Sequence, residues 1–131
     1  MTTTSKMAFI LFILTTALAA AAQKNEADYV ELIRQQMGGQ KEVAVNSGYV
    51  DLVTGRYAIE VEFANKWKQS IGQALWYGLQ TDRTPGVVLI KRGENDHKYV
   101  IQFGSALQYA GLEEAFYGIF NDLFKYDFRK E

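Results

Sequence analysis

The stretch GYVDLVTGRYAIEVEFANKWKQSIGQALWY, residues 48–77, decides the fold. Its first half alternates apolar and polar residues around a Thr-Gly turn, which predicts two antiparallel strands over 49–53 and 56–63. Its second half repeats apolar side chains at three- and four-residue intervals, which predicts an amphipathic helix over 65–80. A hairpin that runs directly into a helix is therefore the expected centre of the domain.

The hairpin carries three carboxylates. If Thr54 and Gly55 form a two-residue loop, strand alternation places Asp51 on the same face as Glu60 and Glu62. Asp51 and Glu60 are then diagonal neighbours, about 7 Å apart at Cβ, and both can reach one divalent cation. The solvated face of an ordinary hairpin looks the same, so spacing alone leaves both interpretations open. The opposite face is the expected core face: Val50, Leu52, Tyr57, Ile59, Val61 and Phe63.

The helix carries a matching polar stripe. At 100° per residue, Lys66, Ser70, Gln73 and Tyr77 fall within about 40° of one another. A helix that follows directly on the second strand of the hairpin can lay this stripe beside the carboxylates. Lys66 would then point at a bound phosphate or at an attacking water, although a plain polar margin of the helix has the same pattern.

The rest of the chain predicts alternating helices and strands. Residues 26–37 have helical spacing, with Asn25 as N-cap and two glycines after the end. Residues 42–46 and 99–103 are expected strands, and GVVLIKR at 86–92 has the pattern of a strand buried on both faces. A phenylalanine-rich closing helix is expected over 113–126. The order α-β-β-β-α-β-β-α predicts an α/β (α+β mixed sheet) domain with helices packed against it.

The N-terminal segment has the features of a signal peptide. Lys6 supplies a positive charge, an apolar run follows from Met7 to Leu18, and three alanines precede Gln23. We expect residues 1–22 to be cleaved, with an uncleaved anchor as the alternative. Residues 23–131 then form a single domain that is periplasmic or secreted, without integral membrane association.

Composition limits the chemistry. The chain has no cysteine and one histidine, which excludes disulfides, thiolate metal sites and multi-histidine zinc sites. Any metal would be held by oxygen atoms, which favours magnesium, manganese or calcium. With 14 basic and 15 acidic residues there is no overall basic charge for nucleic acid, but local pairs remain at Lys66/Lys68, Lys91/Arg92 and Arg129/Lys130.

At these residues the chain resembles the PD-(D/E)XK nuclease superfamily, the restriction-endonuclease-like fold. That family has an α-β-β-β-α-β core with Asp on the second strand and Glu-x-Lys on the third. The matching positions are Asp51 and Glu60-Val61-Glu62, and the run from Gln73 to Tyr77 is similar to the family's Gln-x-x-x-Tyr motif. The run AIEVEFANKWKQSIGQALWYGLQT, with the following GVVLI, also resembles a group of small exported bacterial proteins of unassigned function.

The resemblance implies a restriction-endonuclease-like core with an added strand and a C-terminal helix. It implies that Asp51, Glu60 and the carbonyl of Val61 hold Mg²⁺ or Mn²⁺ for hydrolysis of DNA. Lys66 would orient the water or stabilise the phosphate, and Gln73, with Tyr77 beside it, would help to position the water.

The chain departs from the family at Glu62, which occupies the position of the family's lysine. Some branches move this lysine to the following helix, where Lys66 is placed to replace it, with Lys68 as the fallback. Glu62 is otherwise a further metal ligand, or the site has decayed. Glu31 in the first helix is the candidate for the family's auxiliary acidic residue, although an exposed glutamate would fit there equally well.

Three functions are consistent with these observations. The first is an exported metal-dependent nuclease, and the second is a catalytically inactive nuclease-fold protein that serves as a periplasmic binding or interaction module. The third is an interaction protein that docks through aromatic side chains of its C-terminal part, for which burial in the domain's own core is the alternative. Those side chains are Phe116, Phe120, Phe124, Tyr126 and Phe128.

Overall fold

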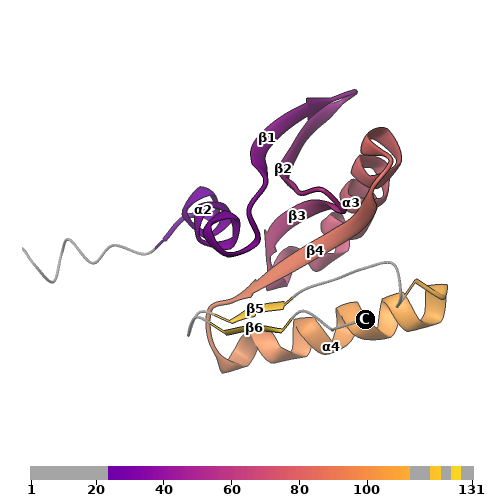
Figure 1. Cartoon of the computed structure of the whole chain (residues 1–131). Coiled ribbons are helices and arrows are strands. Elements are labelled where there is room, and N and C mark those ends of the chain that lie inside the picture. The colour runs from indigo at the N-terminus through magenta and orange to yellow at the C-terminus, as the bar shows by residue number, and fades with distance from the viewer. Residues whose placement is uncertain (1–23, 113–118, 122–124, 128–131) are drawn as a thin grey trace, which may run out of the picture.

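The computed structural model describes residues 24–112, 119–121 and 125–127. These residues form one six-stranded mixed sheet whose strands lie in sequence order, with helices on both faces (Figure 1). The elements are α2 (Glu26–Met37), β1 (Gln40–Val45), β2 (Gly48–Val53), β3 (Tyr57–Phe63), α3 (Trp67–Thr81), β4 (Thr84–Lys91), α4 (His97–Ala110), β5 (Ile119–Asn121) and β6 (Lys125–Asp127). Short 3₁₀ helices precede α3 and α4, at Ala64–Lys66 and Glu94–Asp96.

The predicted mixed α/β class is confirmed. From α2 to β4 the elements follow the expected order α-β-β-β-α-β. Strands β1, β2 and β3 are antiparallel neighbours, and the crossover through α3 makes β4 parallel to β3. The first helix begins as predicted, because the Asn25 side chain accepts from the Asp28 N–H at 2.9 Å and Asp28 accepts from the Asn25 N–H at 2.8 Å.

The prediction of a strand over 99–103 is wrong. These residues lie inside α4, which buries Phe103 and Leu107 against Val87 and Leu89 of β4. The two buried residues are four positions apart, which places them on one face of a helix. The predicted strand covered only residues 99–103, a run too short to show this helical spacing. The helix therefore covers one face of the strand that the sequence correctly identified as buried on both sides.

The predicted closing helix over 113–126 is also wrong where the structure describes it. Residues 119–121 and 125–127 are strands: β5 pairs in parallel with β4, and β6 pairs antiparallel with β5. The apolar strand β4 would otherwise present an unpaired edge, and this pairing covers that edge over its last three residues, Leu89 to Lys91. The remaining residues of that prediction lie outside the described part of the chain.

The sheet separates two cores. On one face, α2 packs Tyr29, Val30 and Ile33 onto β2, β3 and β4. On the other face, α3 and α4 cover Val87 and Leu89 of β4. No helix among the described residues is long and apolar enough to cross a bilayer, and the predicted signal peptide at 1–22 lies outside them.

The hairpin differs from its predicted register. Its loop has three residues, 54–56, and Val53 pairs with Ala58 where a two-residue loop would pair it with Arg56. The Thr54 hydroxyl accepts from the Tyr57 N–H at 2.9 Å and stabilises the longer loop. Continuing the pairs Leu52–Ile59 and Val53–Ala58 by one step places Asp51 opposite Glu60 instead of diagonal to it. A shift of two residues leaves side chains on the same face, so the predicted carboxylate face survives the error.

Strands β1 and β2 bend together at Glu42, which has a φ of 53°. On one side of the bend, Leu52 joins the core under α2. On the other side, Val50 packs with Ala58 and with Tyr77 of α3. The expectation that Val50 and Leu52 share one core face is therefore wrong, because the bend turns these two residues, which are two positions apart, to opposite faces of the sheet.

Candidate functional site

The site lies where β2 and β3 part. The two strands pair at Leu52–Ile59 and Val53–Ala58. One step further along, the Val61 N–H donates to Asp51 Oδ2 at 2.8 Å, so a side chain takes the place of a backbone acceptor. This bond fixes the Asp51 carboxylate beside Glu60, close enough for each group to change the pKa of the other.

Glu60 is the most unusual group of the site. Glu60 is 5% exposed, and its side-chain oxygen Oε2 has no hydrogen-bond partner in the described part of the chain. Burial, and then the charge of Asp51, raise the pKa of Glu60 to about 9. Burial also raises the pKa of Asp51, against the bond from Val61. A buried, unsatisfied carboxyl oxygen is costly unless something else binds it.

Two more carboxylates complete the cluster. Glu62 is 7% exposed, accepts from the Phe63 N–H at 2.9 Å and is hydrogen-bonded to Glu26 in the first turn of α2. Burial, followed by the charge of Glu62 and this hydrogen bond, raises the pKa of Glu26 to about 7. The sequence reasoning noticed the acidic first turn of this helix only as a helix-start signal, and so missed Glu26.

Glu31 lies apart from this cluster. It accepts from Arg34 Nη2 at 2.8 Å and forms an ion pair with Lys41 Nζ at 2.7 Å. The hydrogen bond with Arg34, and then that with Lys41, lower its pKa. Five residues after Glu26, it faces a different side of α2, because five helical steps turn by about 140° beyond a full turn.

Lys66 reaches the cluster from the 3₁₀ helix before α3. The residue is exposed, and its positive charge acts on Glu26, opposing the rise in the pKa of that carboxyl. The helix was predicted to begin at residue 65, but α3 begins two residues later, at Trp67. The fallback lysine, Lys68, instead lies 5.8 Å from the centre of the Trp67 ring.

Tyr77 connects α3 to the hairpin. It is 6% exposed and hydrogen-bonded to the Tyr49 backbone and to the Gln73 side chain. Burial, and then the charges of Glu60 and Asp51, raise its pKa. A Cβ at Gly48 would come within 2.7 Å of the Tyr77 hydroxyl, so only glycine permits this approach. Gln73 itself is exposed, and its link to the site is this hydrogen bond to Tyr77.

A cleft of about 400 Å³ opens onto the site between the start of α2 and the bend of β1 and β2. Glu26, Glu42 and Asp51 line it, together with Lys41. The negative charge of Glu42 adds to the rise in the pKa of Asp51. The sequence reasoning also missed Glu42, because it looked like one more exposed strand residue.

The donors at the site are hard oxygen atoms. Within the described ranges, no group of three or more His, Cys, Asp or Glu side chains is arranged to hold a metal ion. The pair Asp51 and Glu60 is smaller than such a group, but it includes the unpartnered Glu60 Oε2 in a buried position. Oxygen donors of this type suit Mg²⁺ or Mn²⁺.

Comparison with known proteins finds similarity over part of the chain only. No family model matches the chain, and no solved structure matches it. It is similar to three proteins of Acanthamoeba polyphaga mimivirus that are named as KilA-N domain-containing: R878 (38% identical over 47 residues), L32 (41% over 46) and L33 (32% over 84). These alignments cover 36%, 35% and 63% of the chain, but 13%, 12% and 34% of the relatives. The chain thus spans about a third or less of each relative, and the resemblance to the nuclease superfamily stays a prediction.

Proposed function

We propose that the chain binds DNA and hydrolyses its phosphodiester bonds with the help of a divalent metal ion. The observation that carries this proposal is the buried Glu60 Oε2, which has no partner in the described residues and lies beside a fixed Asp51. Similarity to KilA-N domain proteins supports the DNA part, since KilA-N is a DNA-binding domain. The nuclease part rests on the carboxylates and on the resemblance of the motif.

In this proposal Asp51, Glu60 and the backbone carbonyl of Val61 hold Mg²⁺ or Mn²⁺. Such an ion, when bound, supplies Lewis acidity toward a phosphate oxygen and acidity to water. The Val61 N–H keeps Asp51 in place, and burial keeps Glu60 rigid. The rigid pair is the kind of prearranged charge on which catalysis by electrostatics depends.

The other residues bind, orient and move protons. Lys66 contacts the phosphate or orients the attacking water, and its exposed position leaves it free to do so. Glu26, with a pKa of about 7, is suited to accept a proton from water near neutral pH. Glu62 bonds to the Phe63 N–H and to Glu26, so Lys66 is the candidate to replace the family's lysine.

The direct test is cleavage of plasmid and of linear single- and double-stranded DNA with Mg²⁺ or Mn²⁺. We expect Glu60→Gln and Asp51→Asn to reduce cleavage by at least about 100-fold, since even indirect partners of metal ligands cost 10- to 100-fold. Glu31→Gln is the matched control and should cleave like the wild type, because Glu31 lies outside the cluster. Cleavage that survives both Asp51→Ala and EDTA would sink the proposal.

A second candidate is DNA binding without cleavage. It is favoured by Glu62 in the lysine position and by the lack of a group of three acidic ligands in the described residues. Wild-type protein that binds DNA but leaves it intact with either ion would support this candidate.

Export also remains a proposal. Mass spectrometry of the mature protein would test it, and the expected result is an N-terminus near Gln23.

A further inference from the structure

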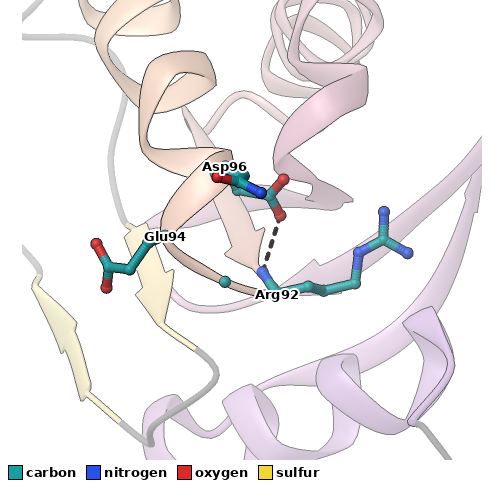
Figure 2. A pocket seen from close by; sticks show the side chains of 5 residues that line it. Arg92, Glu94 and Asp96 are labelled. Atoms are coloured by element: carbon teal, nitrogen blue, oxygen red, sulfur yellow. Dashed lines mark hydrogen bonds between the residues drawn. The ribbon is translucent and has the colours of Figure 1, made fainter.

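The loop after β4 directs one arginine away from its acidic neighbours. Residues 92–96 line a pocket of about 290 Å³, and the Arg92 N–H donates to Asp96 Oδ2 at 2.9 Å (Figure 2). Figure 2 shows the side chain of Arg92 extending to the opposite side from the Glu94 carboxylate. The guanidinium therefore leaves the loop instead of pairing within it.

Two groups fix the guanidinium where it ends. Its carbon lies 4.3 Å from the centre of the Phe63 ring, and Nη2 donates to Asn65 Oδ1 at 3.3 Å. The Phe63 ring is itself held edge-to-face by Tyr29 of α2, with ring centres 6.0 Å apart. An exposed arginine that is stacked and hydrogen-bonded has lost much of its freedom before any ligand arrives.

Its supports place Arg92 at the carboxyl ends of β3 and β4, next in the chain to groups of the site. Phe63 follows Glu62 directly, Asn65 precedes Lys66 directly, and Tyr29 is one helical turn after Glu26. Each group that holds the guanidinium is thus a near neighbour in the chain of a group in the site. The sheet brings β4 beside β3 in parallel, so their carboxyl ends meet here.

The positive charge of Arg92 is not neutralised by the cluster. Across the described ranges, no carboxylate lies within ion-pairing distance of its guanidinium. Arginine has five N–H donors, and Asn65 uses one of them, which leaves donors in the plane of the fork. Such a fork matches the oxygens of a phosphate, whereas the carboxylates alone would repel one.

We propose that Arg92 binds a backbone phosphate of DNA next to the carboxylate cluster and so admits the strand to it. This inference rests on the proposed function, because it takes DNA as the ligand. It adds a phosphate-binding position that the motif does not contain. Nothing in the contact depends on the base, so the contact should be independent of sequence.

The test measures DNA binding by the full-length chain in the Glu60→Gln background, where the proposed cleavage is removed. Fluorescence anisotropy with a labelled duplex at several KCl concentrations compares Arg92→Gln with Arg56→Gln. Arg56 is the matched control, because it lies over Tyr57 at the other end of β3, with 5.4 Å between guanidinium carbon and ring centre. Glutamine keeps an amide that can bond Asn65 while removing the charge.

We expect Arg92→Gln to weaken binding about 3- to 10-fold and to reduce the slope of log K against log salt by about 0.9, the loss of one phosphate contact. Arg56→Gln should leave both unchanged. Equal slopes for the two variants would overturn the role of Arg92 and leave the proposed function standing. Absence of DNA binding in every protein, with no cleavage by the wild type, would overturn both.

Discussion

Two glutamates of this domain, Glu31 and Glu60, lie in opposite environments, which shift their pKa values in opposite directions. Glu31 is partly exposed and is held by Arg34 and Lys41, which lower its pKa. Glu60 is buried beside Asp51, has an oxygen without a partner in the described residues, and has a pKa raised to about 9. The comparison shows that the exposed carboxylate is paired with two cations, whereas the buried one forms no ion pair within the described residues.

This difference indicates a different role for each glutamate. Glu31, through its ion pairs, links α2 to β1 and keeps its charge without taking part in proton transfer. A cluster of buried carboxyl groups costs stability unless protons or a cation neutralise it. A protein that tolerates this cost at one place, within reach of a cleft, has a functional reason to keep the charges there.

The largest expected effect is the pH dependence of stability without metal. The folded-state pKa of Glu60, about 9, lies above its ordinary value of 4.5, so its stabilisation is complete below 4.5 and is lost as pH rises toward 9. One retained proton is equivalent to about 1.4 kcal/mol per pH unit, or on the order of 3 kcal/mol between pH 6 and pH 8. Urea unfolding in EDTA should show this loss, and Glu60→Gln should reduce it to the smaller contribution of Glu26. A wild-type profile as flat as that of the variant would contradict the comparison.

The next effect is stabilisation by a divalent ion. At pH 8, Mg²⁺ or Mn²⁺ at 100 times its dissociation constant should raise the free energy of unfolding by about 2.7 kcal/mol. The gain should be smaller at pH 6, where protons compete for the carboxylates. Thermal unfolding should show it in the wild type and in Glu31→Gln but not in Glu60→Gln. Shifts of equal size in all three proteins would assign the ion to another place.

The smallest effect concerns Glu42, which lies between the ion pairs of Glu31 and the carboxylates around Glu60. It follows Lys41, the partner of Glu31, and its charge acts on Asp51. Its φ of 53° is a left-handed conformation that costs a glutamate about 1 kcal/mol. Glu42→Gly should therefore stabilise the domain by up to about that amount in urea unfolding, while Glu42→Gln changes the charge and keeps the bend. Destabilisation by glycine beyond that of glutamine would show that the bend is not strained.

The elements around the site were largely predictable because their signals are local. Asn25 caps its helix, a threonine and a glycine mark the hairpin loop, and alternation places Glu60 and Glu62 on one face of β3. The strand predicted over 99–103, and the helix predicted over 113–126 where its residues are described, were wrong because short apolar runs fit both periods. Only packing decides between them: α4 covers β4 on one face, and β5 pairs with its edge.

The sequence by itself determined the mixed architecture and the carboxylates of the hairpin, since hydrophobic period and side-chain alternation are properties of neighbouring residues. Only the tertiary structure decided which glutamate of α2 joins them, because the choice of Glu26 over Glu31 depends on how the helix is rotated over the sheet. It also decided that Glu60 is buried without a partner in the described residues, and that Arg92 meets Asn65 across 27 positions. Burial and long-range contacts arise when distant segments pack, and no local pattern records them.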